Sequence, residues 1–264
     1  MYLLQLLKDT CKKIVAMLND IKIEDIMFLD IETVPLAPSF ENLDPVSRTH
    51  WDKKSKFFRT PEQSAEEVYE RSGIYSEFGK IICISVGFIN EKNPFSFRIK
   101  SFFGDDEKKI LSEFSDVLIK FSKSGKDALL CAHNGREFDF PYIARRMIVN
   151  KIVIPEILDN AGKKPWELKL LDTMDLWKFG DYKNYTSLDL LTSILGIPSP
   201  KDDIDGSMVA GIYYNEKDIA RIVRYCEKDV LSIARILLRF KNLPEIPDER
   251  VESVTEYPPT SKTD

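Results

Sequence analysis

Ile26-Met27-Phe28-Leu29-Asp30-Ile31-Glu32-Thr33-Val34-Pro35 is the stretch that decides the fold of this 264-residue chain. Its run of apolar, aromatic and β-branched residues predicts a buried strand, and Pro35 marks the end. Side chains two residues apart on a strand point to the same face, so Asp30 and Glu32 are expected side by side, roughly 6.5 Å apart along the chain. Two such carboxylates repel each other and resist loss of water, which a hard cation such as Mg²⁺ or Mn²⁺ would relieve. Alternatively, the strand runs out into solvent, where acidic side chains carry no penalty.

Composition excludes some classes of protein. A hydrophobic content of 43% with 31% charged residues is typical of a globular protein, and the length favours one domain with additions. The net charge of −5 argues against a broad basic surface that holds nucleic acid. It does not argue against a protein that reaches phosphate through bound metal ions, because acids are then the ligands.

Cysteines and the N-terminus indicate where the protein works. The cysteines at positions 11, 83, 131 and 226 have no metal-binding spacing and are expected to be buried free thiols in a reducing compartment. The N-terminal stretch has neither a signal-peptide pattern nor a membrane-span pattern. We therefore expect a cytoplasmic protein with no membrane partner.

The chain divides into three parts. Residues 1–25 have apolar side chains at helical spacing and are expected to form an amphipathic helix. Residues 26–242 are expected to form the folded domain, with an insert at residues 36–78 directly after the first strand. Residues 243–264 are rich in proline and charge and are expected to be a disordered tail.

Strands and helices follow in a defined order within the domain. Strands are expected at 26–35, 80–89, 94–100, 127–132 and 168–172, and helices at 105–121, 187–195, 207–213 and 215–240. The second and third strands have no helix between them and are expected to be antiparallel neighbours, whereas later strands are separated by helices. This order predicts an α/β fold with a mixed five-stranded sheet and helices on both faces.

The insert has two features of its own. Residues 61–73 are expected to form a helix, with a proline at its start and a glycine at its end. Residues 48–59 mix cations with aromatic side chains, which suits single-stranded nucleic acid because rings stack on bases and cations pair with phosphates. The alternative is a surface segment with a few anchoring aromatic side chains.

A second polar group follows the fourth strand, in His133-Asn134-Gly135-Arg136-Glu137-Phe138-Asp139. The Asn-Gly pair indicates a turn, and Asp139 two residues before a proline indicates the start of a helix. Asp139 can therefore be a simple helix cap. His133 can lie near a functional site or serve as a local structural residue.

A third acidic position lies on the last helix. Tyr225 and Asp229 are four residues apart, so they lie on the same side of the helix, next to its apolar stripe. An aspartate beside an apolar face is unusual unless it is paired or binds a metal. The alternative is an aspartate that pairs with Arg224, Lys228 or Arg235.

Together the three segments resemble a known superfamily. The motifs are Phe28-Leu29-Asp30-Ile31-Glu32-Thr33, Asn134-Gly135-Arg136-Glu137-Phe138-Asp139 and Tyr225-Cys226-Glu227-Lys228-Asp229. Their order and spacing resemble the DnaQ-like (DEDDy) 3′–5′ exonucleases, and most closely the proofreading exonuclease domain of family B DNA polymerases, here as a stand-alone protein. The flanking stretches 78–82, 141–145 and 201–206 also resemble that branch. The histidine branch would have histidine at position 224, which is arginine here, so the tyrosine branch fits.

The resemblance covers about residues 26–240 and implies an RNase H-like fold and two divalent ions, Mg²⁺ or Mn²⁺, about 4 Å apart. It implies that Asp30 bridges both ions and that Glu32 and Asp229 complete the site of the ion that generates the attacking hydroxide. Asp139 would support the second ion, and Tyr225 would orient the attacking water.

The resemblance also implies substrate contacts and an activity. Asn134 and Phe138 would touch the terminal nucleotide, and the backbone of Ile31 and Thr33 its 3′-hydroxyl. The implied reaction releases nucleoside 5′-monophosphates from the 3′ end of DNA, with single strands favoured. Two alternatives stay open: a 3′–5′ exoribonuclease of the ribonuclease D type, and a catalytically silent scaffold that binds nucleic acid.

Overall fold

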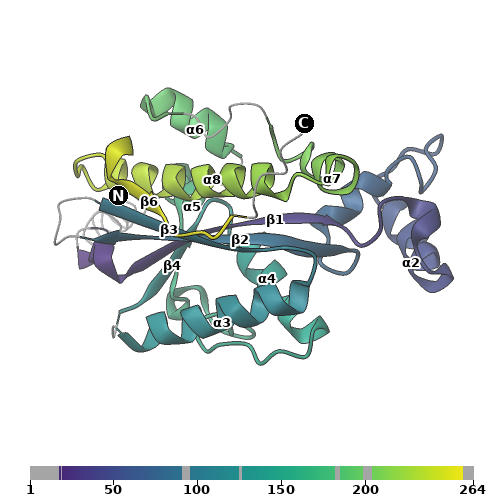
Figure 1. Ribbon diagram of the computed structural model, residues 1–264, viewed down its shortest axis with the longest axis horizontal. Helices are drawn as coiled ribbons and strands as arrows, with labels where there is room; N and C mark the ends of the chain where they lie inside the picture. Colours follow the sequence, from purple (N-terminus) through teal and green to yellow (C-terminus); the bar gives the residue numbers. More distant parts are fainter. Residues whose placement is uncertain are drawn as a thin grey trace, which may run out of the picture.

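A mixed sheet forms the centre of the protein (Figure 1). The computed structural model describes residues 18, 20–90, 96–124, 127–181, 185–198 and 204–257. In these parts of the chain the sheet has six strands in the spatial order β5-β4-β1-β2-β3-β6. The strands are β1 (Ile26–Pro35), β2 (Gly79–Asn90), β3 (Ser96–Phe103), β4 (Leu129–Ala132), β5 (Leu170–Asp172) and β6 (Val251–Ser253).

The strand directions are those of an RNase H-like fold. β2 and β3 are antiparallel neighbours, as expected, and β1 is antiparallel to β2, whereas β4 runs parallel to β1 and β5 parallel to β4. The predicted fold class is therefore confirmed. β1 lies in the middle of the sheet although it comes first in the chain, and the apolar composition of its first half agrees with burial on both faces.

Helices cover both faces of the sheet. The α-helices are α2 (Pro45–Ser55), α3 (Glu107–Ser124), α4 (Asp139–Val149), α5 (Thr173–Lys178), α6 (Leu188–Leu195), α7 (Val209–Gly211) and α8 (Ile219–Phe240). Single-turn and irregular helices are η1 (Ile23–Asp25), η2 (Phe40–Asn42), η3 (Tyr69–Ile74), η4 (Pro165–Glu167), η5 (Ile212–Glu216) and η6 (Asp248–Arg250). α3 and α4 lie on one face of the sheet, and α8 lies along the other (Figure 1).

Alternation along β1 supplies two separate cores. Met27, Leu29 and Ile31 pack in the core that includes α3 and α4. Ile26 and Phe28 pack in the core that includes α8. Since Asp30 and Glu32 continue the second series, the alternation directs their side chains toward the α8 face.

A buried ion pair joins helices to strand on the α3 and α4 face. Arg146 of α4 donates two hydrogen bonds, of 2.8 and 2.6 Å, to the carboxylate of Glu107 on α3. The same carboxylate accepts the backbone N–H of Ile81 on β2, and Arg146 also donates to the carbonyl of Ser76 in the insert. The pair therefore connects both helices, the sheet and the insert.

The sheet has one strand more than the five predicted. β6 comes from residues 243–264, which we expected to be a disordered tail, and it pairs in parallel with β3. Ile246 is fully buried, and the carboxylate of Glu227 on α8 accepts hydrogen bonds from Ser253, Thr255 and Tyr257. These long-range contacts hold the described part of the segment, residues 243–257, against the domain.

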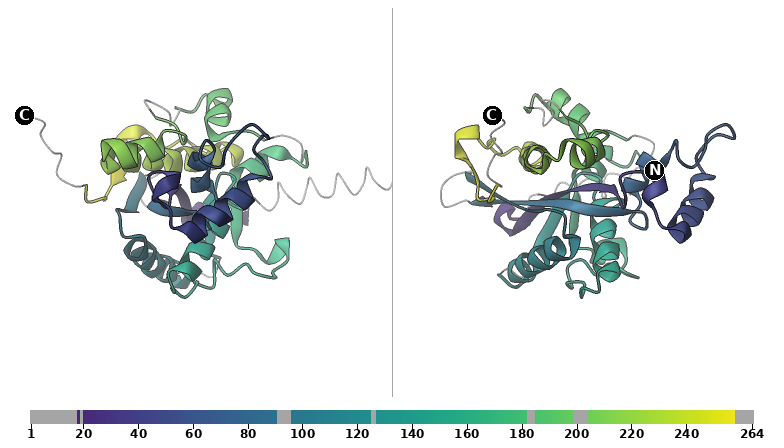
Figure 2. Two further views of the ribbon diagram at one scale, coloured as in Figure 1. Left: turned by 90° about the vertical axis from the view of Figure 1, so that its right-hand side faces the viewer. Right: turned by 45° about the vertical axis from the view of Figure 1, so that its right-hand side comes forward.

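The insert folds differently from the prediction. Its first part contains α2, for which no helix was predicted; Asp44 caps this helix by accepting the N–H groups of Val46 and Ser47. The expected helix at residues 61–73 is instead a series of turns followed by η3. α2 lies beyond the end of the sheet at which β1 finishes (Figures 1 and 2).

The remaining predicted helices of the domain are present, some with different ends. The helices expected at 105–121 and 187–195 correspond to α3 and α6, and the one at 207–213 to α7 and the π-helical turn η5. α8 begins at Ile219 rather than at residue 215, with Asp218 as its cap. Of the N-terminal helix predicted at residues 1–25, positions 1–17 and 19 lie outside the described residues, and its end, Ile23–Asp25, is the single-turn helix η1. No helix in the described parts of the chain is long and apolar enough to cross a membrane.

Candidate active site

The acidic residues of the three sequence motifs meet at one end of β1. Asp30 and Glu32 lie on β1, Asp139 is the first residue of α4 after β4, and Asp229 lies on α8. Because β1 and β4 are parallel, their carboxyl ends lie at the same edge of the sheet, and this brings the start of α4 to the acids of β1. Burial raises the pKa of Asp30, and the charges of Asp229, Asp139 and Glu32 raise it further.

Burial and mutual repulsion set the ionisation of the group. Glu32, Asp139 and Asp229 are only 7%, 2% and 8% exposed. Burial, followed by the charge of Asp229, raises the pKa of both Asp30 and Glu32 well above the ordinary value. Burial, together with the charges of Asp172 and Asp229, raises the pKa of Asp139 to about 8. The cluster therefore favours protons or cations over bare negative charge.

A thiol belongs to this cluster. The Sγ of Cys226 lies 3.4 Å from Oδ2 of Asp30, to which it donates a weak hydrogen bond. One ligand atom from each of Asp30, Glu32 and Cys226 can be chosen so that all three lie within 4.8 Å of one another. Cys226 follows Tyr225 directly, so its place on the buried side of α8 brings it to the end of β1.

The residues fit a site for hard divalent cations. Oδ1 of Asp139 and Oδ1 of Asn134 are buried and have no hydrogen-bond partner among the residues that the structure describes. A buried carboxylate oxygen without a donor is costly unless something positive reaches it. Four carboxylates from three elements also supply the oxygen ligands that Mg²⁺ and Mn²⁺ prefer.

Tyr225 lies next to the acids on α8 and is partly buried. Burial and the charges of Asp229, Glu32 and Asp30 raise its pKa far above that of an ordinary tyrosine. Its hydroxyl therefore keeps its proton and can donate a hydrogen bond. The alternative ion pair of Asp229 with Arg235 is not what the contacts of Arg235 show, because its guanidinium binds Asp248 and the carbonyl of Ile246.

The Asn134 turn is held by an aspartate that sequence reasoning missed. The buried carboxylate of Asp172, at the end of β5, accepts the backbone N–H groups of Asn134 and Arg136. It also accepts the N–H groups that begin α5. Asn134 itself has a left-handed φ of 61°. The only sequence signal for Asp172 was its position at the end of an apolar strand.

His133 and Asp139 lie on either side of the Asn134 turn in the sequence. Asp139 lies one residue past the cap position of α4, which Phe138 occupies, so it is not a simple helix cap. The ring of His133 contacts Thr173 Oγ1 and the carbonyl of Thr186, both at 2.8 Å. These contacts are those of a local structural residue.

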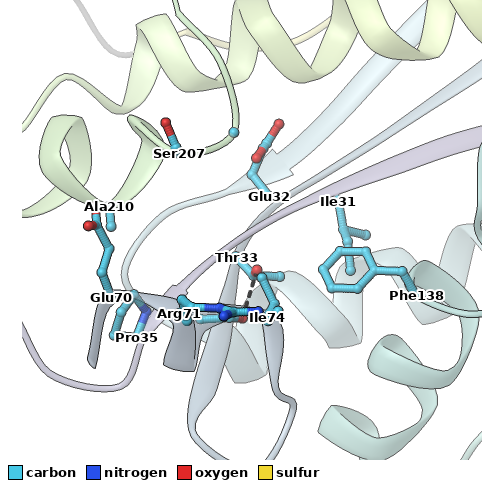
Figure 3. A pocket seen from close by; sticks show the side chains of 12 residues that line it. Ile31, Glu32, Thr33, Pro35, Glu70, Arg71, Ile74, Phe138, Ser207 and Ala210 are labelled. Atoms are coloured by element: carbon cyan, nitrogen blue, oxygen red, sulfur yellow. Dashed lines mark hydrogen bonds between the residues drawn. The ribbon is translucent and has the colours of Figure 1, made fainter. Parts of the chain in front are cut away.

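A pocket of about 490 Å³ opens between the end of β1 and the insert (Figure 3). It is lined by four of the residues that the motifs pointed to: Ile31, Glu32, Thr33 and Phe138. Asn134 is not among its lining residues. The Oγ1 of Thr33 donates its hydrogen to the carbonyl of Gly73, so this hydrogen is used within the protein.

A second pocket, of about 260 Å³, is lined by Tyr225 and Asp229, by Ser187 and the first residues of α6, and by Asp205. Gly206 lines both pockets. The two pockets therefore meet beside the carboxylates. Gly206 ends the flanking stretch 201–206, of which residues 201–203 lie outside the described residues.

Residues 74–254 match the family described as predicted 3′–5′ exonucleases related to the exonuclease domain of PolB. The chain belongs to this family. The suspected relationship to the exonuclease domain of family B polymerases is confirmed. In this PolB-related exonuclease the matched region includes Asp139, Tyr225 and Asp229. The region begins after β1, the strand that carries Asp30 and Glu32.

One solved structure similar to this PolB-related exonuclease is the family B DNA polymerase from the hyperthermophilic archaeon Pyrobaculum calidifontis. The two are 16% identical with a TM-score of 0.49, over 81% of this chain and 24% of the polymerase chain. The chain therefore spans about a quarter of the polymerase chain that it matches. No curated protein sequence matches this chain.

Proposed function

We propose that this protein is a metal-dependent 3′–5′ exonuclease of the tyrosine (DEDDy) type, which removes nucleoside 5′-monophosphates from the 3′ end of DNA. The observation that carries the proposal is the convergence of four acids from β1, α4 and α8 beside a pocket of about 490 Å³. This volume lies within the range of about 300–1,000 Å³ that is usual for small-molecule sites.

Two divalent cations, Mg²⁺ or Mn²⁺, would be held by Asp30, Glu32, Asp139 and Asp229. When bound, such ions neutralise negative charge on the scissile phosphate and lower the pKa of water. Asp30 would be a ligand of both ions, as the resemblance to the exonuclease superfamily implies. Glu32 and Asp229 would serve one ion, and Asp139 the other.

Protein groups next to the carboxylates would position the reactants. The protonated hydroxyl of Tyr225, together with Glu32, would hold the attacking water in line with the phosphate. Since burial and nearby acids raise the pKa of this tyrosine, it would act as a hydrogen-bond donor rather than as a base. Phe138 and Ile31 would contact the terminal nucleotide in the pocket, and the backbone of Thr33 its 3′-hydroxyl. Asn134, which does not line the pocket, would contact the terminal nucleotide from beside it.

A digestion assay tests the proposal. Oligonucleotides labelled at the 5′ end, offered as single-stranded DNA, duplex DNA, mismatched duplex and RNA, are incubated with Mg²⁺ or Mn²⁺. We expect a ladder that shortens from the 3′ end, fastest on single-stranded DNA, with nucleoside 5′-monophosphates as products. Faster shortening of RNA would instead favour the exoribonuclease alternative.

A matched variant separates this activity from contamination. Asp229→Asn removes one proposed ligand while keeping the size of the side chain, so the ladder should disappear. The absence of a ladder with the unchanged protein under all of these conditions would leave the scaffold alternative. The buried free thiols of Cys83, Cys131 and Cys226 would suit a reducing compartment, which is part of this proposal.

A further inference from the structure

Four side chains of the insert form a continuous stack beside the pocket. The rings of Phe58 and Tyr75 are stacked, with centroids 5.8 Å apart and planes 14° apart. The guanidinium carbon of Arg71 lies 4.6 Å from the Phe58 centroid, and Lys54 Nζ lies 4.9 Å from the Tyr75 centroid. Two aromatic rings therefore lie between two cations.

Arg71 lies at the pocket end of this stack. It lines the same pocket as Glu32 and Phe138, and Figure 3 shows its guanidinium on the side of the pocket opposite Glu32. The side chain is exposed, and among the described residues no carboxylate lies within salt-bridge distance of it. The guanidinium carbon lies over the Phe58 ring, and the exposed Arg71 side chain lines the pocket, so a ligand in the pocket can reach it.

The backbone that carries Arg71 is fixed to the sheet. The carbonyl of Gly73 accepts hydrogen bonds from Thr33 Oγ1 on β1, at 2.9 Å, and from the Tyr142 hydroxyl on α4, at 2.8 Å. A Cβ added at Gly73 would come within 3.1 Å of Pro35, so the two backbones are in close contact. The position of Arg71 is therefore set by the same strand that carries Asp30 and Glu32.

The pocket walls favour a base over a phosphate at this place. Ile31, Ile74 and Phe138 supply apolar surface around Arg71. A terminal nucleotide has one phosphate, at its 5′ side, which must lie at the acids for hydrolysis. Its base and sugar are then what remains for the pocket, and a planar guanidinium stacks well on a planar base.

We propose that Arg71, held on the Phe58 ring, forms a platform on which the base of the 3′-terminal nucleotide stacks. This inference rests on the proposed exonuclease function and deepens it, because it assigns a substrate-positioning role to the insert. Arg71 acts on binding and placement of the end, and the chemistry belongs to the acids.

Binding measurements test the platform separately from activity. The probe is a fluorescein-labelled oligothymidine, with either an intact 3′ nucleotide or an abasic 3′ residue, titrated in Mg²⁺ by anisotropy. The Asp229→Asn background keeps the oligonucleotide intact. Arg71→Gln should weaken binding of the intact end about tenfold and leave binding of the abasic end within about twofold. Lys53→Gln removes a charge from an exposed position of the same insert and should have little effect on either probe.

A second variant separates the plane of the group from its charge. Arg71→Lys keeps the charge but loses the plane, so it should lose most of the same affinity. Full affinity of Arg71→Lys, equal weakening at intact and abasic ends, or no weakening by Arg71→Gln would each overturn the platform.

Kinetics keep the two proposals apart. With Asp229 restored, Arg71→Gln should raise KM about tenfold and change kcat less than about twofold. If the unchanged protein shortens no oligonucleotide, the proposed function fails while the binding data still decide the role of Arg71. If it shortens oligonucleotides and Arg71→Gln behaves like the unchanged protein, only the platform fails.

Discussion

Replacing Asp139 with asparagine should stabilise the metal-free protein, and only at high pH. Asp139 is 2% exposed, and burial with the neighbouring acids raises its pKa from 3.8 to about 8. The folded protein therefore binds this proton more tightly than the unfolded chain does. Stability from this preference is complete below about pH 4, is lost as pH rises, and the loss levels off above about pH 8.

The size of the effect follows from the shift. One pKa unit corresponds to about 1.4 kcal/mol, so a change from 3.8 to about 8 sets an upper limit of about 6 kcal/mol. Because the chain relaxes and water enters when the group ionises, we expect Asp139→Asn to raise the free energy of unfolding by about 3 kcal/mol at pH 8. At pH 4 the two proteins should be nearly equal.

Urea denaturation in EDTA, at steps between pH 4 and 8, measures this difference. Asp159→Asn, at an exposed aspartate, is the matched control and should follow the unchanged protein throughout. Mg²⁺ should then stabilise the unchanged protein at pH 8 more than it stabilises Asp139→Asn. A variant that is less stable than the unchanged protein at pH 8 would show that the carboxylate is structural, and the reasoning would be refuted.

Three other substitutions have distinct expected outcomes. Asp229→Asn should lower kcat by about 10³-fold or more while the circular dichroism spectrum stays the same; an unfolded variant would contradict a catalytic role. Tyr225→Phe should lower kcat by about 10²-fold with little change in KM, because only the hydroxyl is lost; an unchanged kcat would remove it from the mechanism. Arg146→Met should cost about 3–5 kcal/mol in urea denaturation, because it leaves the buried carboxylate of Glu107 without its partner. A cost below about 1 kcal/mol would mean that Glu107 is adequately bound by its other donors.

The central part of the fold was predictable because its signals are local. The apolar run of β1 ends in a proline, and the periodicity of α3 and α8 follows their buried faces. The acids were found from the spacing of Asp30 and Glu32, from the turn after β4 and from the four-residue interval to Asp229. The resemblance then supplied their common purpose, which no single motif specified.

The parts that were not predicted depend on contacts between distant residues. β6 is only three residues long. It is held in the sheet by pairing with β3 and by hydroxyl groups that donate hydrogen bonds to the carboxylate of Glu227. The helical pattern of residues 61–73 is overridden at η3, where two hydrogen bonds from other elements hold Gly73. The Asp44-Pro45 pair is a local start signal for α2, but no helix was predicted there.

The roles of the aromatic residues in the insert were also predicted only in part. Composition at residues 48–59 suggested rings that are free for bases, with anchoring side chains as the alternative. Trp51 is fully buried in the core of the insert, whereas Phe57 is 88% exposed. Phe58 is also an anchoring ring, because it packs against that core and Arg71 lies over it.

The central position of β1 has a practical consequence for anyone who trims this protein for expression. A fragment cut to residues 74–254 would begin after β1, so β2 and β4 would face each other across a missing strand. The unpaired edges of both strands would then be open to other copies of the fragment. Such a fragment should precipitate or refold poorly, and an experimenter who tested it for nuclease activity would be testing a protein without two of its four acids.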